Sequence, residues 1–428
     1  MTGRLVVDDG QLAMPGITPT GVRAEVDRWL EQHWDPDRSV AEWWKLLADA
    51  GLSNSMLPAP YSRDLAAAVF AAIAKRRVVG PPNGLGLMLA APTIAVHGTG
   101  EQQARFLPGI LDGSEGWCQL FSEPGAGSDL AGLQTRAEQD GDEWVVNGQK
   151  VWTSTGQHAD WGILIARTNP DAPKHQGISY FLFPMRKPGV EVRPLREMTG
   201  RAIFNEVFLD NARVHGSCLL GELNNGWAVA NTTLMFERAG IGGGGGGFSS
   251  AIPGSVAGHL GRRVGDFVGR SGQLSSGGVG VHTFNQLVEL AGRFERLGDP
   301  TVRQHLAELH IRLELLRLTV SRAKHREAVP GAGNIAKICM TELVRHVREL
   351  AGLILGPELT LWGPESVTGG ALQELVVFSP APSIYGGTDE IQRNILGERV
   401  LGLPKEPGPA KETPFRELAV GTQRSHLA

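Results

Sequence analysis

The chain has 428 residues, 41% of them apolar, which is enough to form a sizeable core in two or three domains. Its formal net charge of −4 gives no basic face for nucleic acid and no polybasic membrane anchor. Cys118, Cys218 and Cys339 are far apart and form no CxxC pair, which argues against a disulfide framework or a metal cluster. We therefore expect a soluble, cytoplasmic protein. The longest apolar run, LGLMLAAPTIAV, is short and broken by proline, so we predict no membrane span.

The first part of the chain is predicted to be helical. From about Val22 to Arg77, apolar residues recur at helical spacing in three segments, VRAEVDRWLEQHW, VAEWWKLLADAGL and LAAAVFAAIAKRR. A further short helix is expected between Gly98 and Gly113. These segments predict an N-terminal helical domain over residues 20–115.

The pattern then changes to that of a compact all-β domain, predicted over residues 116–220. Short β-branched or aromatic runs alternate there with Gly, Asn, Asp and Pro. Within DGDEWVVNGQKVW, the DGD and NG segments are predicted to be the turns of a hairpin pair. The six predicted strands are GWCQLF, WVVNGQKVWTS, WGILIART, ISYFLFPM, VEVRPL and NEVFLDNARV.

Helical periodicity returns after Gly226 and predicts a four-helix bundle over residues 221–405. The interval GRSGQLSSGGVGVH, residues 269–282, is expected to be a mobile loop. Residues 406–428 form a polar tail that we expect to be poorly ordered. The fold class is therefore a multidomain α+β protein. The four predicted helices are WAVANTTLMFERAG, RQHLAELHIRLELLRLTVSRAKHREAV, NIAKICMTELVRHVRELAGLIL and TDEIQRNILGERVLG.

The segment SEPGAGSD is suited to binding a flat polar ligand. Its residues from Pro124 to Gly127 allow the main chain to approach a ligand closely, and Ser122 and Ser128 provide hydroxyls at the end of a strand. The alternative interpretation is a strand followed by a tight glycine turn. The glycines lack the spacing of a dinucleotide-binding fingerprint, and no P-loop lysine follows them.

A second segment, KVWTSTG, places Trp152 next to two polar residues, Thr153 and Ser154. A broad indole face can exclude water from a reactive ring and hold that ring in one plane. A tryptophan in the core of a strand is the alternative. Because a core strand would prefer valine at the two following positions, the polar pair favours the cofactor interpretation.

Four segments closely resemble the acyl-CoA dehydrogenases: WCQLFSEPGAGSDLAGLQTRA, DEWVVNGQKVWTSTG, FNEVFLDNARV and IYGGTDEIQRNILGERVLG. The resemblance extends from about Val22 to Pro407. It implies a small β-barrel as the middle domain, FAD as cofactor, and dehydrogenation of an acyl-CoA thioester to the trans-2-enoyl-CoA, with electrons passed to an electron-transferring flavoprotein. The flavin contacts that it implies are Gln119, Phe121, Ser122, Gly127, Ser128, Trp152, Thr153, Ser154, Thr388 and Glu390.

The chemistry of this family needs a carboxylate that removes the α-proton of the thioester. Some members carry it just before Gly-Thr in the terminal motif, where this chain has Gly386. Others carry it on a bundle helix at a residue followed by Arg, which matches Glu237 and Arg238. We therefore expect Glu237 to be the base, and no metal to take part. The preceding residues LMF make the surroundings apolar, which should raise the pKa of Glu237. A surface glutamate paired with Arg238 is the alternative.

The resemblance also implies how the thioester is held. Ser128, Arg238 and Gly386 are the expected substrate-binding residues, with a backbone N–H near Gly386 directed at the thioester carbonyl oxygen. Thr388 is in addition a plausible helix N-cap, with Asp389 and Glu390 in the first turn. Six consecutive glycines, 242–247, either make room beside Glu237 for a bulky, branched or polycyclic acyl group or form an unwound loop.

The chain departs from the family pattern where a neighbouring subunit usually contacts the adenine half of FAD. In place of Arg-x-x-Phe-Gly it has Arg263 and Phe267, one residue too far apart, and in place of paired glycines it has Gly356-Pro357. This suggests a sister subunit in an α2β2 heterotetramer, as in actinobacterial enzymes for steroid or branched acyl-CoA esters, and otherwise a homo-oligomer. A non-catalytic or half-site partner subunit, or a flavin oxidase or monooxygenase of the same fold, is the alternative function.

Overall fold

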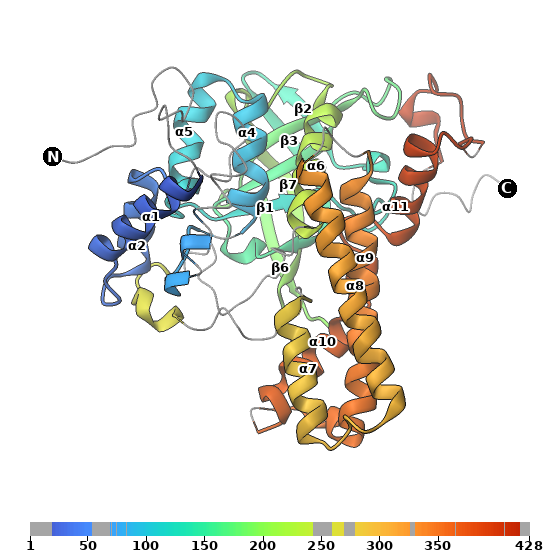
Figure 1. Ribbon diagram of the computed structural model, residues 1–428. Coiled ribbons are helices and arrows are strands. Elements are labelled where there is room, and N and C mark those ends of the chain that lie inside the picture. The colour runs from blue at the N-terminus through green and yellow to red at the C-terminus, as the bar shows by residue number, and fades with distance from the viewer. Residues whose placement is uncertain are drawn as a thin grey trace.

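A sheet lies at the centre of the molecule; in Figure 1 the N-terminal helices α1 and α2 are to its left, and the C-terminal helices extend to its right and below it. The predicted order of a helical, an all-β and a second helical domain is confirmed. The computed structural model describes residues 19–53, 69, 71–73, 75–82, 84–242, 259–268, 279–325, 330–363, 365–405 and 407–419. Residues 243–247 of the glycine run, residues 269–278 of the predicted loop and part of the third predicted helix lie outside these ranges.

The N-terminal helices begin at capping boxes that their sequences supply. Ser39 caps α2 together with Glu42, and Thr99 caps α5 together with Gln102. Trp43 is fully buried, and its indole N–H donates to the carbonyl oxygen of Val79 at 2.7 Å. The helices are α1 (Pro19–His33), α2 (Val40–Asp49), α4 (Ala91–His97) and α5 (Gly100–Leu111), with a π-helical turn at Gly86–Ala90 before α4. The turn and α4 were not predicted.

The middle part of the chain forms one curled, seven-stranded sheet, in the order β1-β4-β2-β3-β7-β6 with β5 on the other edge of β4. The strands are β1 (Trp117–Leu120), β2 (Arg136–Asp140), β3 (Glu143–Ser154), β4 (Trp161–Arg167), β5 (Ile178–Pro184), β6 (Val190–Leu195) and β7 (Phe204–His215). All six predicted strands are present. The additional strand, β2, is polar and mostly exposed, so it has no apolar alternation to mark it.

One predicted turn is wrong. The DG turn does join β2 to β3, where Asp140 pairs with Glu143, but Asn147 and Gly148 lie inside β3. The register of β3 against β7 shifts between Val146 and Gly148, so these residues form an irregularity in the ladder. Gly148 has a φ of 158°, and a Cβ there would lie 2.3 Å from Oγ1 of Thr135. The glycine is needed for this close approach of the neighbouring strand.

Side chains of the sheet alternate between two apolar cores. Along β4, Ile163 and Ile165 face the core shared with α4, α5 and α6, whereas Leu164 and Ala166 face a second core within the β domain. The sheet is therefore covered by helices on one face. This arrangement places α6 directly against β5 and the end of β1.

The C-terminal helices form a long arm in which α7, α8, α9 and α10 share one core (Figure 1). The helices are α6 (Gly226–Gly242), α7 (Val281–Arg293), α8 (Pro300–His325), α9 (Ala332–Leu355), α10 (Ala371–Phe378) and α11 (Asp389–Ile395), the last extended by a π-helical turn at Leu396–Val400. The four predicted helices are present, and α7 and α10 were missed. Because α7 begins at Val281, the predicted loop ends two residues before its expected boundary at residue 282.

The polar tail is not uniformly loose, which corrects the expectation of poor order for residues 407–419. Phe415 is buried, and the Arg167 guanidinium lies 3.6 Å from the centre of its ring. The Phe415 backbone N–H donates to the carbonyl oxygen of Ala172 at 2.9 Å. One aromatic residue in a polar segment therefore anchors it to the loop after β4.

Two expectations about the whole chain can be compared with the structure. Cys118, Cys218 and Cys339 are free thiols, as expected. In the part of the chain that the structure describes, no helix has both the length and the hydropathy that a bilayer crossing needs.

Candidate active site

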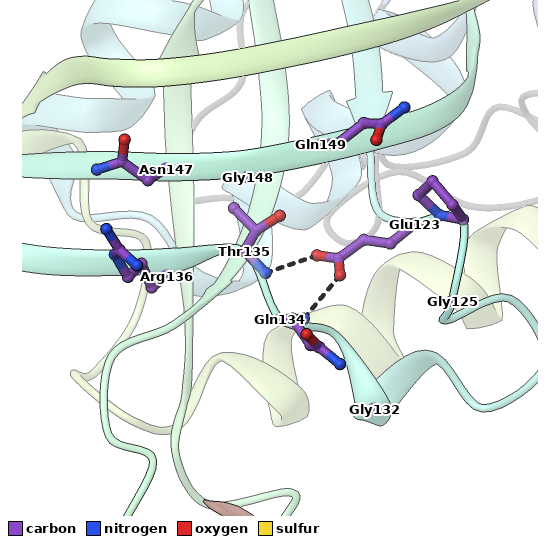
Figure 2. A pocket seen from close by; sticks show the side chains of 10 residues that line it. Glu123, Gly125, Gly132, Gln134, Thr135, Arg136, Asn147, Gly148 and Gln149 are labelled. Atoms are coloured by element: carbon purple, nitrogen blue, oxygen red, sulfur yellow. Dashed lines mark hydrogen bonds between the residues drawn. The ribbon is translucent and has the colours of Figure 1, made fainter. Parts of the chain in front are cut away.

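A buried ion pair joins the two motifs on the sheet. The Lys150 ammonium on β3 donates to the Glu123 carboxylate at 2.9 Å and to the carbonyl oxygen of Phe121 at 3.0 Å. Both side chains are buried, and the same carboxylate accepts the backbone N–H groups of Gln134 and Thr135 (Figure 2). This pair holds the end of β1 and its SEPGAGSD segment against β3.

Trp152 lies at a distortion of β3 and is 61% exposed. Its φ of 61° is in the left-handed region, which is costly for a bulky residue, and the register against β7 shifts between Lys150 and Thr153. One edge of the indole meets Phe204, with ring centroids 5.9 Å apart. The alternative of a core tryptophan is therefore wrong. Trp152 therefore exposes a large aromatic surface to solvent, and its backbone has a strained conformation.

The residues after Trp152 are buried and polar. Thr153 and Ser154 pair with Asn205 and Phe204 of β7, and Asn205 Nδ2 donates to the carbonyl oxygen of Thr153 at 2.9 Å. Within the described residues, Oγ1 of Thr153 has no hydrogen-bond partner. Buried hydroxyls in proteins nearly always have a hydrogen-bond partner. The Thr153 hydroxyl, next to the exposed Trp152 indole, is therefore available to a polar group of a bound ligand.

The SEPGAGSD segment leaves the sheet next to Trp152. The Ser122 carbonyl oxygen accepts the Val151 backbone N–H at 2.9 Å, so Ser122 and Trp152 are neighbours across the two strands. Gly127 and Ser128 are exposed, and a Cβ at Gly127 would meet nothing within 4 Å. Packing within the protein therefore does not require this glycine, and there is open space in front of it.

Helix α6 is attached to the sheet one turn before Glu237. The buried Thr233 hydroxyl lies 3.0 Å from the Tyr180 hydroxyl on β5 and 3.0 Å from the Thr93 hydroxyl on α4. Phe121, predicted to contact a flavin, is buried with its ring edge-on to Tyr180 at a centroid distance of 5.9 Å. Its side chain is thus part of the core, and its carbonyl oxygen is bound by Lys150.

Glu237 is partly buried and lies beside the β1 motif. Desolvation raises the pKa of its carboxyl group, while a hydrogen bond from the Gln119 side chain and the charge of Arg238 act in the opposite direction. Of the expected apolar neighbours, Leu234 and Phe236 pack against the core, but Met235 is 53% exposed. Glu237 does interact with the charge of Arg238, as the alternative of a paired surface glutamate requires, but it is partly buried and its hydrogen bond from Gln119 also connects it to β1.

The terminal motif has Gly386 in a turn shortly before α11. Gly386 and Gly387 have φ values of 63° and 82°, which favour glycine. Gln392 Nε2 donates to the carbonyl oxygen of Gly386 at 2.7 Å, and Asn334 of α9 donates in turn to Gln392 at 2.6 Å. The backbone N–H of Gly386 donates no hydrogen bond to any residue in the described ranges.

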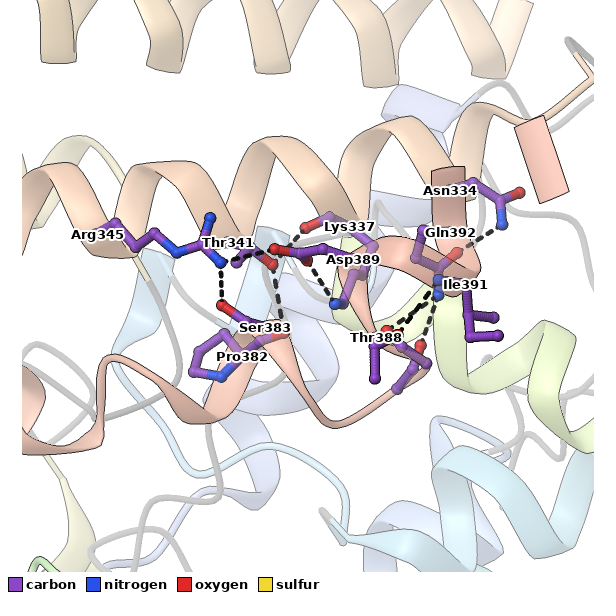
Figure 3. Close-up of polar contacts among 12 residues, drawn as sticks. Asn334, Lys337, Thr341, Arg345, Pro382, Ser383, Thr388, Asp389, Ile391 and Gln392 are labelled. Carbon is purple, nitrogen blue, oxygen red and sulfur yellow. Dashed lines mark hydrogen bonds and ion pairs between the residues drawn. The ribbon is translucent and has the colours of Figure 1, made fainter. Parts of the chain in front are cut away.

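Thr388 caps α11, as predicted, by accepting the Ile391 N–H at 3.2 Å. Asp389 does more than occupy the first turn. Its buried carboxylate pairs with Lys337 at 3.0 Å and with Arg345 at 2.8 Å (Figure 3). Glu390 is exposed. The start of α11 is thus fixed to α9 by a buried ion pair and a second, partly exposed cation.

The predicted residues fall into two groups that Gln119 and Glu237 connect. One group lies on β1 and β3, around Ser122, Trp152 and Ser154. The other group lies on α6 and α11, which both approach α9. A Cβ at Gly333 of α9 would lie 3.9 Å from Cβ of Arg238 on α6. The next residue of α9, Asn334, donates a hydrogen bond to Gln392 on α11. No hydrogen bond or ion pair joins α11 to β3 among the residues described. In the described part of the chain, Thr388 and Glu390 are thus not tied to the Trp152 group by a hydrogen bond or an ion pair.

A cavity of about 400 Å³ lies beside this site rather than in it. Glu123, Pro124 and Gly125 line one side, and Thr135 and Gln149 lie across from them (Figure 2). None of the predicted catalytic, cofactor or substrate residues lines the cavity. It borders the SEPGAGSD segment through Glu123, Pro124 and Gly125.

Arg263 and Phe267 lie against the N-terminal helices of their own chain. Phe267 is buried in the core of α1 and α2, with the Arg262 guanidinium 4.7 Å from its ring centre. Arg263 pairs with Asp37. Phe267 is therefore enclosed within its own chain, whereas the side chain of Arg263 remains 61% exposed beside Asp37.

Sequence reasoning missed the residues that hold the site together. Lys150 and Glu123 carried one signal, since a lysine within the apolar strand WVVNGQKVW is unusual unless it is paired. Lys337 and Asp389 carried a similar one, because Lys337 falls on the apolar side of the α9 pattern and is buried. Neither ion pair could be predicted from the sequence, because the partners lie 27 positions apart in the first pair and 52 in the second.

The comparison with known proteins covers all three domains. The acyl-CoA dehydrogenase N-terminal domain matches residues 20–114, the middle domain residues 118–212 and the C-terminal domain residues 273–401. The acyl-CoA dehydrogenase IpdE1 of Mycobacterium tuberculosis is 41% identical over 76% of this chain and 76% of its own length. IpdE1 of Mycolicibacterium smegmatis is 36% identical over 90% of this chain and 97% of its own.

Solved structures agree with the sequence relatives. The Tcur3481-Tcur3483 steroid ACAD has a TM-score of 0.69 and 27% identity, covering 91% of this chain and 98% of the other. The ChsE4-ChsE5 complex of Mycobacterium tuberculosis has a TM-score of 0.66 and 27% identity, covering 92% of this chain and all of the other, 100%. Three matched domains, full-length relatives and shared folds lead to one conclusion: the chain belongs to the acyl-CoA dehydrogenase family of flavoprotein oxidoreductases.

Proposed function

We propose that this chain binds FAD and dehydrogenates an acyl-CoA thioester to the trans-2-enoyl-CoA, with Glu237 as the base. The observation that carries the proposal is the position of Glu237. Its carboxylate is partly buried, it accepts a hydrogen bond from Gln119 on β1, and desolvation raises its pKa. At the other position where members of the family carry the base, this chain has Gly386, which has no side chain that could remove a proton. A carboxylate with a raised pKa is better matched to removing a weakly acidic proton.

The residues of this chain fit the flavin ring system. Trp152 offers an exposed aromatic face, Thr153 has a buried hydroxyl without a partner among the described residues, and open space lies in front of Gly127. Gln119, Ser122, Ser128 and Ser154 would add polar contacts, and Phe121 would contribute through its main chain. Thr388 and Glu390, on α11, belong to the far side of the site or to the site of another subunit. FAD, when bound, would accept the hydride from the β-carbon of the substrate.

The protein groups each have a distinct task. Glu237 takes the α-proton onto a carboxylate oxygen, and Gln119 keeps that carboxylate oriented toward β1. Trp152 keeps water from the reacting atoms, and Ser128 and Arg238 lie where the thioester and its phosphopantetheine arm would pass. Desolvation lowers the pKa of Arg238 while the Glu237 charge raises it, which fits a cation that shares a partly buried site with the base.

Gly386 supports the reaction through its main chain. Its carbonyl oxygen is bound by Gln392, and its N–H is unused within the described part of the chain. A donor fixed in this way can stabilise the negative charge that develops on the thioester oxygen when the α-proton leaves. A positive φ at this position allows the N–H to be presented without a side chain in the way.

Replacing Glu237 with Gln tests the assignment. The variant should retain flavin but lose at least about 100-fold in turnover with an acyl-CoA and an artificial electron acceptor, the scale of a missing general base. Glu222→Gln is the matched control, because Glu222 is exposed and precedes α6. Full turnover in the Glu237 variant would mean that the base, or the whole reaction, is supplied by another chain, and this subunit would then be a half-site partner.

We infer that the acyl group is bulky, branched or steroid-derived and that an electron-transferring flavoprotein accepts the electrons. The support is the similar solved structure named a steroid ACAD, at 27% identity and covering 91% of this chain. Residues 243–247 of the glycine run lie outside the described ranges and add nothing to this inference. Turnover of a steroid side-chain acyl-CoA should exceed that of octanoyl-CoA. Oxygen consumption without reduction of the flavoprotein would instead identify an oxidase.

We also infer that a sister subunit completes FAD binding in a heterotetramer. The support is that Arg263 and Phe267 are engaged within their own chain and that Gly356 is followed by Pro357, while the ChsE4-ChsE5 neighbour is described as a complex. Co-expression with an adjacent acyl-CoA dehydrogenase gene product should yield a yellow complex, whereas the chain alone should retain little flavin. A fully flavinylated, active homotetramer of this chain alone would reject the sister subunit and leave the catalytic proposal intact.

A further inference from the structure

Far from the acyl-CoA site, three side chains with metal-binding groups meet between α8 and α9. They are His305 and Glu308, three residues apart on α8, and His346 on the facing α9. One potential ligand atom from each lies within 4.8 Å of the others. We propose that this cluster is a binding site for a single zinc-like divalent cation that links the two helices.

The arrangement follows from the helix geometry. Residues three apart on a helix project from the same side, so His305 and Glu308 point together. The neighbouring α9 brings His346 opposite them, and the two imidazole rings lie 5.1 Å apart between centroids. Two imidazoles and one carboxylate are a ligand set that zinc accepts, with a fourth position left for water or another group.

The hydrogen bonds favour coordination by both imidazoles. His346 Nε2 lies 2.9 Å from the carbonyl oxygen of His305, which can only accept, so Nε2 carries the proton. The unprotonated nitrogen of the neutral His346 ring is therefore Nδ1. This is the backbone-oriented imidazole that metal sites commonly show.

His305 supplies a second, independent observation. Its Nδ1 atom is buried and has no hydrogen-bond partner among the residues described. Buried ring nitrogens are nearly always paired with a donor, an acceptor or a bound ion. A cation beside Nδ1 would satisfy this atom, and the nearest groups able to share such a cation are His346 and Glu308.

Glu308 is held ready by Arg312, one turn further along α8. The Arg312 Nε and terminal nitrogen contact the same carboxylate oxygen, Oε1, at 2.8 and 2.7 Å. Among the described residues the other oxygen, Oε2, accepts no hydrogen bond, so it can turn to a cation. Arg312 also forms an ion pair with Glu342 on α9, at 3.1 Å. This second carboxylate offsets part of the positive charge that Arg312 brings near the proposed cation site.

The spacing suits a small adjustment on binding. Tetrahedral zinc, with bonds of about 2.0–2.2 Å, separates its ligand atoms by roughly 3.4 Å. Atoms already within 4.8 Å of one another reach that separation through side-chain rotation of His305 and Glu308, which are only partly buried. The bound cation would thereby link α8 to α9 near the start of α8, in the arm whose helices α7, α8, α9 and α10 share one apolar core.

Zinc titration of the purified full-length protein in its native assembly tests the site. After removal of metals with EDTA, calorimetry should show one zinc bound per chain, and zinc should raise the midpoint of thermal unfolding by several degrees. His305→Gln and Glu308→Gln should each weaken binding at least tenfold, the scale seen even for outer-shell changes. His310→Gln is the matched control, because His310 is exposed on the same helix and stacks on Phe284 instead.

The outcomes are distinct. Glu308 is partly exposed, so its variant should fold and retain flavin, and its loss of zinc binding would report on the site alone. No bound zinc, or equal affinity in the wild type, both site variants and the control, would overturn the proposal. Dehydrogenase activity is not needed for any of these measurements, so the proposal stands or falls independently of Glu237.

Discussion

At position 386 the chain has a glycine in a left-handed turn, and at position 237 it has a glutamate whose carboxylate meets Gln119. In the proposed reaction the two residues divide one task. The glycine would offer an N–H without a side chain, and the glutamate would offer a partly desolvated carboxylate from another helix. On this proposal the terminal motif can lack a carboxylate without the site being inactive.

The raised pKa of Glu237 predicts a particular pH dependence. The base works as the carboxylate, so activity should be full above its pKa and fall as the pH drops through it. Because desolvation raises the pKa, the fall should begin above the ordinary glutamate value of 4.5. The profile of kcat/KM against pH in a stable buffer series measures this, and an acidic limb at or below 4.5 would contradict it.

Trp152 should matter for cofactor binding and little for folding. Its side chain is 61% exposed, so Trp152→Ala should change stability by only about 0.5 kcal/mol while weakening flavin binding by about tenfold. Trp362→Ala is the control, because Trp362 is 58% exposed and lies away from the predicted site. Flavin absorbance after gel filtration measures the loss, and equal flavin retention in both variants would remove Trp152 from the site.

At the scale of elements, buried ion pairs fix the positions of strands and helices that carry the site. Lys150 and Glu123 join β3 to the end of β1, and Lys337 and Asp389 join α9 to α11. In each case a charged residue is buried only because an element distant in the sequence supplies its partner. Removing one partner leaves an uncompensated charge in the interior.

Lys150→Met should therefore destabilise the protein by about 3–5 kcal/mol, because Glu123 would stay buried without its cation. Lys45→Met is a matched substitution in an exposed i,i+4 pair with Asp49, and should cost no more than about 0.5 kcal/mol. Chemical unfolding followed by tryptophan fluorescence compares the two. Similar effects of both substitutions would show that the buried pair does not hold the β1 and β3 junction.

For the whole molecule, the arm of C-terminal helices presents an apolar stripe on α8. Ile311, Leu315 and Leu318 recur at helical spacing and are 55%, 58% and 53% exposed. Exposed apolar residues in successive turns commonly mark contacts with another subunit. This stripe is consistent with the assembly proposed above, in which another chain of the same fold would cover it.

Leu315→Lys should therefore weaken the assembly, because a buried interface position would receive an unpaired charge. Size-exclusion chromatography with light scattering should show smaller species for this variant at the same concentration. Arg303→Leu is a useful control, since Arg303 is exposed on the same helix away from the stripe. An unchanged mass for Leu315→Lys would place the subunit contacts elsewhere.

The sequence determined much of the architecture, because local patterns carry it. Helical periodicity, a capping residue such as Thr388, and short apolar runs are properties of neighbouring residues, and they correctly predicted the order of the domains and most elements. They failed where local signals were weak or misleading. The polar strand β2 was missed, and Asn147-Gly148 was read as a turn although close packing on Thr135 requires that glycine within a strand.

Only the tertiary structure decided which distant residues meet. The contact of Gln119 with Glu237, the partners of Lys150 and Lys337, the exposure of Trp152, and the cluster of His305, Glu308 and His346 all join positions on separate elements. Sequence can name the residue types that the chemistry needs. The distances that set burial, pKa and pairing arise from packing between elements, and they exist only once the chain has folded.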